Sequence, residues 1–333
     1  MPFRTPRLPH MMNIRQLLTA ITLCDMHMGI APTRVTPERT SITTILSLPI
    51  DFLRESRLSV QVIFLIRFCT AAALGASVLD ARLLAAGVAW LLATVAAYVF
   101  NGVMDVAEDR ANGSTRPISR GALPVPVAAA GVLVAAALAL AIAAIVDPTG
   151  LLPLLLMAHL ACGYAYSGPP FYGKQRGSTA ALLVLGMGAL TYAAGWRLGG
   201  PGGGLSVLVL GAAMSLWMAG VGALAKDLPD AEGDAVGGRR TPVIVWGATR
   251  VRLMVAVNAL LIGAGYLTAA LTFAPMLVPS AVTLLIGGAV VGILAATSRR
   301  ATTRSGLRQP YRAFMVTQYA VHLVVLGTLL IGL

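Results

Sequence analysis

The chain carries little charge. Only 11% of its 333 residues are Asp, Glu, Lys or Arg, whereas roughly a quarter are charged in a soluble globular domain. Hydrophobic residues make up 57% of the chain, and apolar runs of about 20 residues recur, each long enough to cross a bilayer as a helix. The scarcity of charge excludes an ordinary soluble globule and predicts an integral membrane protein.

Cysteine is scarce as well. The three cysteines, Cys24, Cys69 and Cys162, lack the spacing of metal ligands, which argues against a zinc site and against a disulfide framework. A net charge of +12 would suit a nucleic-acid partner, but the basic residues lie in the loops between the apolar runs. We therefore expect a lipid bilayer around the chain and no nucleic acid.

Nine apolar stretches have the length of membrane spans, which predicts an all-α fold. Residues 1–57 are rich in proline and are expected to form a flexible or surface-lying extension. The segment from Ile14 to Cys24 within them is too short and too weakly apolar for a signal peptide. The membrane domain is expected over 58–333. Its spans are predicted at 58–79, 82–104, 122–146, 150–168, 178–198, 204–226, 250–272, 277–298 and 312–332.

Almost all of the 25 Lys and Arg residues lie in alternate loops, on one side of the predicted spans. Arg82 and Arg197 lie on the other side. Arg67 lies inside the first span, where it needs an Asp partner or a place on a cavity wall. Because positively charged loops stay in the cytoplasm, we expect a cytoplasmic N-terminus and an external C-terminus, in a bacterial cell membrane.

The few acidic residues are concentrated in two clusters, each at the end of a long apolar run on the predicted cytoplasmic side. Carboxylates at a membrane edge are costly unless they are paired or bound to a metal ion. Two such edges facing one cavity would suit Mg²⁺, which shares carboxylates with substrate phosphates. The clusters hold seven of the 13 acids: Asp105, Glu108, Asp109, Asp227, Asp230, Glu232 and Asp234.

Oxygen-bearing side chains recur every four residues in both clusters: Asn101, Asp105 and Asp109 in the first, Asp230 and Asp234 in the second. On one continuous helix this spacing places side chains on a single face. Pro229 excludes an unbroken helix through the sixth span and the second cluster, and it is a candidate first residue of a short helix there.

Cations lie close to both clusters. Arg116 and Arg120 follow the first cluster, Lys226 begins the second, and Arg239 and Arg240 end it. Lys174 lies in the loop between the clusters. Lys174 and Lys226 are the only two lysines in the chain. Lysine acts on phosphate as a compact charge. Glu108 and Glu232 fall outside the four-residue spacing and are expected to be solvated or to lie behind the site.

At these residues the chain resembles the UbiA superfamily of intramembrane prenyltransferases. The first signature of that family, N-D-x-x-D-x-x-x-D followed by Arg-Pro, corresponds to Asn101, Asp105 and Asp109 with Arg116 and Pro117. The second signature, K-D-x-x-D-x-E-G-D, corresponds to 226–234. The loop 166–174 is most like that of the chlorophyll synthase, homogentisate and archaeal lipid prenyltransferase branch.

The resemblance implies nine helices around a central cavity. It also implies a Mg²⁺-dependent enzyme that moves an isoprenyl group from its diphosphate, through an allylic cation, to an aromatic or lipid-like acceptor. The implied catalytic residues are Asp105, Asp109, Asp230 and Asp234. The implied metal ligands are these four with Asn101 and Asp227. The implied diphosphate-binding residues are Asn101, Arg116, Tyr166, Lys174 and Lys226.

The chain departs from the family pattern at two positions. Gly102 stands where the first signature often has Asp, and Tyr172 stands where the loop often has a second Lys. Two other functions stay open: a membrane terpene cyclase that quenches the cation internally, and a non-enzymatic transporter or cation-binding scaffold. Transporters often show two similar halves with polar breaks at mid-membrane, whereas the polar residues here gather at one edge.

Overall fold

The computed structural model describes residues 42–75, 79–200, 202–301 and 303–332. Ser47–Leu333 form one compact unit, and the described part of the chain is helical, without a named strand. Most of the expected N-terminal extension, including Ile14 to Cys24, lies outside the described residues, so its boundary at 57 stays a prediction.

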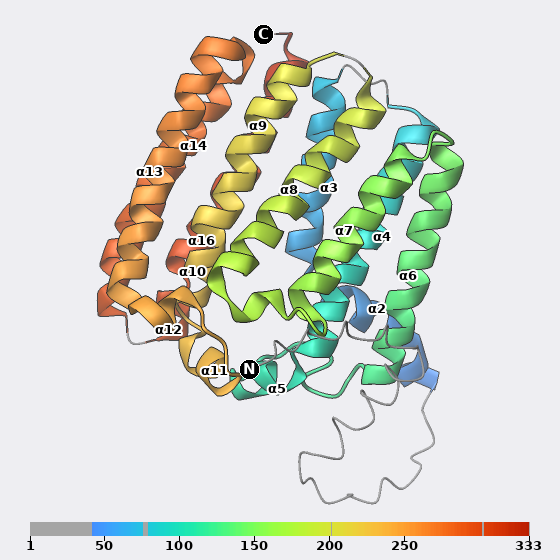
Figure 1. The fold of residues 1–333 in the computed structure, drawn as a ribbon, viewed down its shortest axis with the longest axis vertical. Helices are drawn as coiled ribbons and strands as arrows, with labels where there is room; N and C mark the ends of the chain where they lie inside the picture. The colour runs from blue at the N-terminus through green and yellow to red at the C-terminus, as the bar shows by residue number, and fades with distance from the viewer. Residues whose placement is uncertain (1–41, 76–78, 201, 302, 333) are drawn as a thin grey trace, which may run out of the picture. The chain divides into compact units, whose positions relative to one another are not determined.

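Each of the nine predicted spans contains a helix in the described residues. The helices are α3 (Leu58–Leu74), α4 (Ala81–Met104), α6 (Val125–Val146), α7 (Leu151–Ser167), α8 (Gly177–Gly199), α9 (Gly204–Trp217) continued by a π-helical turn (Met218–Gly222) into α10 (Ala223–Asp227), α13 (Ala248–Phe273), α14 (Val278–Thr297) and α16 (Gln309–Leu330). Figure 1 shows them side by side, running between the same two ends of the bundle.

The nine helices differ in how well they could cross a bilayer. In the described residues, seven are long and apolar enough by themselves, and α3 forms an eighth candidate together with α2 (Ile42–Glu55). These two helices meet at a bend of 66°, where Arg57 has a left-handed backbone (φ 60°). The ninth, α7, is apolar but has only 17 residues. The fold is therefore an all-α membrane fold, with two of the nine predicted spans shorter than expected.

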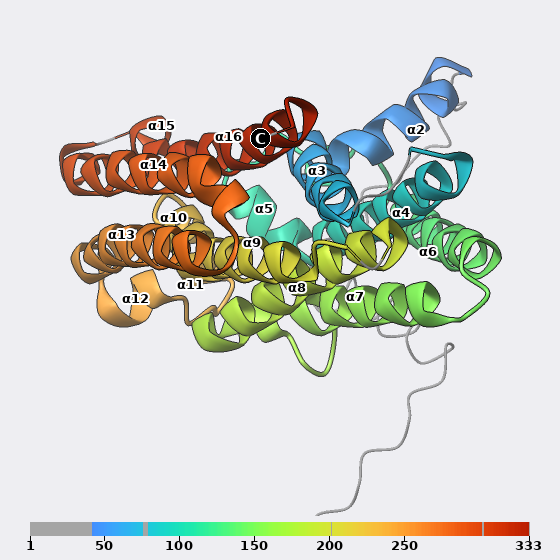
Figure 2. The same ribbon diagram turned by 90° about the horizontal axis from the view of Figure 1, so that it is seen from above.

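Neighbouring helices approach closely where small residues face each other. The pairs with the most extensive contacts are α13 with α14, α4 with α6, α14 with α16, and α3 with α8, and Figure 2 shows these helices end-on. On α8, a Cβ at Gly195 would lie 2.2 Å from the carbonyl oxygen of Phe68 on α3. Small residues permit this backbone approach, and in membranes it is packing of this kind that holds helices together.

Short helices in the loops gather at one end of the bundle (Figure 1). Those labelled there are α5 (Val106–Ala111), α11 (Ala231–Val236) and α12 (Pro242–Trp246). A fourth, α15 (Arg304–Leu307), reaches Asp230 through Arg304. The expectation of one continuous helix face through the first cluster was wrong, because α4 ends at Met104 and α5 begins after Asp105. Pro229 does separate α10 from α11, but it is not the first residue of α11, which begins at Ala231 with Asp230 as its N-cap.

Polar side chains inside the bundle are paired mainly with each other. Arg67 contacts the side-chain oxygen of Gln318, so its hydrogen-bond partner is an amide and not an Asp. The hydroxyl of Tyr192 lies 2.5 Å from His322 Nε2. His159 is fully buried and packs against aromatic rings. Both histidines are therefore packed inside the bundle, His159 against aromatic rings and His322 against Tyr192.

Candidate active site

Asp105 lies at the junction of α4 and α5, where it is nearly buried and surrounded by donors. Asn101, one turn earlier on α4, donates from Nδ2 to Asp105 Oδ2 at 2.8 Å. Lys174, in the loop between α7 and α8, contacts Asp105 Oδ1. Arg239 lies 3.2 Å from Asp105 Oδ2. The break between α4 and α5 thus leaves this carboxylate facing two cations from distant loops.

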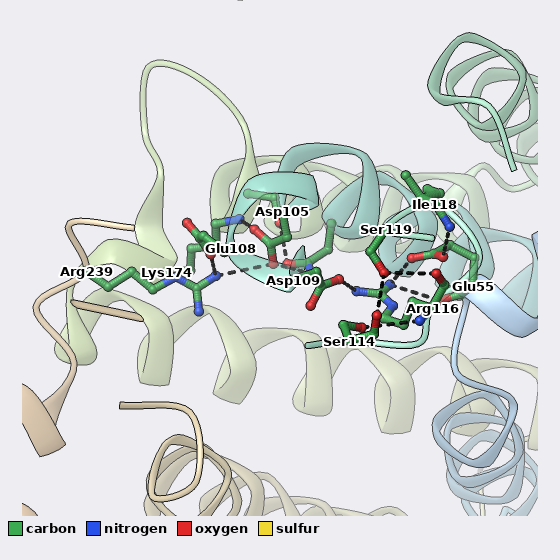
Figure 3. Close-up of polar contacts among 12 residues, drawn as sticks. Glu55, Asp105, Glu108, Asp109, Ser114, Arg116, Ile118, Ser119, Lys174 and Arg239 are labelled. Atoms are coloured by element: carbon green, nitrogen blue, oxygen red, sulfur yellow. Dashed lines mark hydrogen bonds and ion pairs between the residues drawn. The ribbon is translucent and has the colours of Figure 1, made fainter. Parts of the chain in front are cut away.

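Arg239 joins the two acidic clusters. Its guanidinium bonds Asp234 of the second cluster at 3.0 Å and Glu108 of the first at 2.6 Å, in addition to Asp105. The side chain is only 11% exposed. Figure 3 shows Arg239 and Lys174 reaching toward Asp105 and Glu108 from the same side. The spacing within each cluster predicted that the carboxylates come together, and the structure adds the arginine that connects them.

Asp109 is held by Arg116, whose NH1 lies 2.8 Å from Asp109 Oδ2. The other nitrogen, NH2, lies 2.6 Å from Glu55, the last residue of α2. The Glu55 carboxylate also accepts a hydrogen bond of 2.9 Å from the N–H of Ile118. Arg116 therefore lies between two carboxylates that are 54 residues apart in sequence (Figure 3).

The second cluster uses a different set of cations. Asp230 lies 2.6 Å from Arg304 and 3.6 Å from Arg308, in the segment before α16. Lys226 donates to the hydroxyl of Tyr166 at 2.7 Å, and its Nζ lies 3.9 Å from the nearly buried carboxylate of Asp227.

A small pocket opens beside these groups. Its polar lining consists of Tyr166, Lys174, Lys226, Asp227, Arg239 and Thr241. Alanines of α8, the π-helical turn and α10 complete the wall. The two lysines of the chain, predicted to act on one diphosphate, thus line one pocket with an Asp of the second cluster. Arg116 and Asp109 do not line it; they lie on the far side of Asp105 in Figure 3.

Burial shifts the protonation of this site. Burial, and then the positive charges of Arg239 and Lys226, lower the pKa of Lys174 to about 7, although its contact with Asp105 favours the charged form. Burial raises the pKa of Glu108 and of Asp234, and the nearby Arg239 opposes both shifts. Perturbed groups of both signs around one arginine, Arg239, are typical of a functional site.

The donor set suits Mg²⁺ in kind, because it consists of carboxylate and amide oxygens. Asp234 Oδ2 is buried and has no hydrogen-bond partner, which leaves one such oxygen available. In the described residues, however, no three carboxylates, histidines or cysteines converge as a ready-made metal site. Four of the predicted metal-binding carboxylates are instead paired with arginine or lysine within hydrogen-bond distance: Asp105, Asp109, Asp230 and Asp234.

Arg239 was predicted only as a cation at the end of the second cluster, not as a contact between the two clusters. Three residues of this region were not predicted: Glu55, Arg304 and Arg308. They come from segments far away in sequence, and no spacing in a single chain connects them with the acidic clusters.

A model of the UbiA prenyltransferase family matches residues 62–321. This match covers most of the chain, and the protein therefore belongs to the UbiA prenyltransferase family. It is an enzyme of the membrane that transfers prenyl groups.

Solved structures show the same fold. A UbiA homolog from Archaeoglobus fulgidus bound to GPP and Mg²⁺ has a TM-score of 0.65 at 16% identity, over 84% of this chain and 99% of that one. A digeranylgeranylglyceryl phosphate synthase structure has a TM-score of 0.61 at 14% identity, over 85% and 99%. A UbiA homolog from Aeropyrum pernix K1 has 0.54 at 18%, over 81% and 97%. No curated protein matches the chain significantly.

Proposed function

We propose that the protein transfers an isoprenyl group from its diphosphate to an aromatic or lipophilic acceptor, with Mg²⁺, at the pocket beside the two acidic clusters. One observation carries the proposal: residues from the first cluster, the second cluster and the loop between them meet there, through Arg239 and Lys174 on Asp105. The similar Archaeoglobus structures hold GPP or DMAPP together with Mg²⁺, which supports the substrate class and the metal.

In the proposed reaction, the bond between the allylic carbon and the diphosphate oxygen breaks, and the diphosphate leaves with the electron pair. A π-electron pair of the acceptor then forms the new bond to carbon, and the acceptor loses a proton. Bound Mg²⁺ would neutralise charge on the leaving group. Asp105, Asp109, Asp230 and Asp234 would hold it, with Asn101 and Asp227 in support.

The cations of this chain would complete that neutralisation. Lys174 and Lys226 line the pocket, and Tyr166 holds Lys226 in place by its hydroxyl. Arg116 would act from the other side of Asp105. Donors fixed in advance at the developing charge stabilise a transition state without reorganisation. The apolar helices would accommodate the isoprenyl tail and exclude water from the allylic cation.

Diphosphate release by the purified protein in nanodiscs tests the proposal. Geranyl, farnesyl and geranylgeranyl diphosphates are supplied with and without Mg²⁺ and with aromatic or lipid acceptors, and products are identified by mass spectrometry. We expect release that needs Mg²⁺ and an acceptor, and that Asp105→Asn and Asp230→Asn abolish. Asp80→Asn is the matched control, because Asp80 caps the opposite end of α4.

Two results would overturn the proposal. Release without acceptor, giving a cyclic or hydroxylated terpene, would make the protein a cyclase. Binding of Mg²⁺ that is independent of any prenyl diphosphate, without release from any donor, would favour a cation-binding scaffold.

A further inference from the structure

Glu55 is the last residue of α2, and its side chain is completely buried. Its carboxylate contacts Arg116 NH2 at 2.6 Å through Oε1 and accepts from the N–H of Ile118 at 2.9 Å through Oε2. The backbone carbonyl of Glu55 accepts a further 2.9 Å bond from Arg116. One residue of α2 therefore fixes both the side chain of Arg116 and the turn that follows it.

The pairing determines where Arg116 points. With NH2 held by Glu55 and NH1 held by Asp109 at 2.8 Å, the guanidinium is fixed between a residue of α2 and a residue of the first acidic cluster (Figure 3). Charge-assisted hydrogen bonds of this kind are short and directional. Without the Glu55 carboxylate, Arg116 keeps Asp109 and the backbone carbonyl of residue 55 but loses one of its two charged partners.

The Glu55 carboxylate occupies the space that a side chain at position 102 would fill. A Cβ on Gly102 would lie 2.2 Å from Glu55 Oε1 and 2.8 Å from Arg116 NH2. Gly102 lies within α4, with no positive φ, so the backbone does not require glycine there. Glycine is needed for space, at the position where the family pattern often has Asp.

We propose that Glu55 is a positioning residue of the active site: from α2, its carboxylate takes the place of a side chain at position 102 and holds Arg116 against Asp109 of the first acidic cluster. The inference rests on the proposed function for the role of Arg116. It predicts that Asp at position 102 can replace the carboxylate that is lost when Glu55 is removed.

Moving the carboxylate from position 55 to position 102 tests this prediction. Glu55→Ala is expected to lower kcat/KM for the prenyl diphosphate by about tenfold or more, as for loss of a hydrogen bond to a charged group. Adding Gly102→Asp to Glu55→Ala should restore most of the loss. Adding Gly102→Ala should not, because it fills the same space without charge. Asp80→Asn, which removes an exposed acid at the opposite end of α4, controls for net charge.

Rescue by Asp but not by Ala at position 102 would support the proposal, since a merely structural role for the filled space would respond to both. Equal rescue by Ala and Asp, or no rescue by Asp, would overturn it. Thermal unfolding of the same variants repeats the comparison without catalysis: Glu55→Ala lowers the midpoint, and only Asp at 102 recovers it. If the wild-type protein releases no diphosphate, the proposed function fails, and the unfolding series still decides whether the carboxylates replace each other.

Discussion

Arg239 contacts three carboxylates, Asp105, Glu108 and Asp234, from two segments of the chain. Each carboxylate is largely removed from water, and buried charges of one sign repel strongly unless a cation lies among them. The guanidinium of Arg239 therefore compensates much of the negative charge of these carboxylates, two of which are proposed to bind Mg²⁺.

Replacing Arg239 by Gln should destabilise the protein by about 3 kcal/mol, because three carboxylates lose a buried partner. Mg²⁺ should recover more stability in this variant than in the wild type, since it can neutralise the same carboxylates. Thermal unfolding with and without Mg²⁺ measures both effects. Arg240→Gln, at an exposed neighbouring residue, is the control, and equal shifts in the two variants would contradict the prediction.

At the opposite end of the bundle, Asp147 offers a pH-dependent contribution to stability. Burial opposes its ionisation, but hydrogen bonds from Thr149 and from the N–H of Leu152, together with Arg197, lower its pKa below the ordinary value. A depressed pKa in the folded state means that the ionised carboxylate stabilises the protein above the unfolded-state pKa, near 4. That contribution is lost as pH falls through the folded-state pKa.

Asp147→Asn should accordingly lower stability at pH 7 by about 1–3 kcal/mol. The difference from wild type should narrow as the pH is lowered through 4 and toward 3. Chemical unfolding curves at several pH values measure it. Asp80→Asn keeps a good N-cap residue on α4 and should change little, whereas a difference that stays constant with pH would contradict the assignment.

At the scale of elements, some helices pack closely because one of them has a glycine at the contact. Gly195→Ala should separate α8 from α3 and destabilise the protein by about 3 kcal/mol, because the new methyl group meets a backbone carbonyl that cannot turn aside. Gly265→Ala in α13 meets no atom within 4 Å and should be neutral, or stabilising by up to about 1 kcal/mol. Thermal unfolding of the pair distinguishes specific packing from a general effect of alanine.

The helices themselves were predictable because bilayer-length apolar runs are a strong local signal; each predicted span contains a helix. Local spacing also located both acidic clusters. It could not show that Asp105 separates α4 from α5, because this interruption accompanies contacts with Lys174 and Arg239 from distant loops. Nor could it show Glu55 beside Gly102, since a glycine in a sequence does not indicate which side chain fills the space above it.

For the whole molecule, membrane orientation stays a prediction from the loop charges. We expect the short helices α5 and α11 to face the cytoplasm and the C-terminus to lie outside. In bacterial cells, a C-terminal alkaline phosphatase fusion should be active and a C-terminal green fluorescent protein fusion should be dark. A reporter inserted at 238 should show the opposite. A fluorescent C-terminal green fluorescent protein fusion would contradict this predicted orientation.

The short length of α7 has a consequence for how substrate is delivered. Seventeen residues span about 26 Å, less than the roughly 30 Å of a bilayer's hydrocarbon core. The helix runs from the turn after Asp147 to Ser167, whose hydroxyl donates to Asn101 at 2.9 Å. Asn101 would then lie at the depth where a lipid's phosphate meets its tails.

A donor anchored in the membrane by its isoprenoid would reach the site by sideways diffusion, without leaving its leaflet. Turnover would then follow the mole fraction of donor among the lipids, and diluting the donor with inert lipid would slow the enzyme at constant bulk concentration.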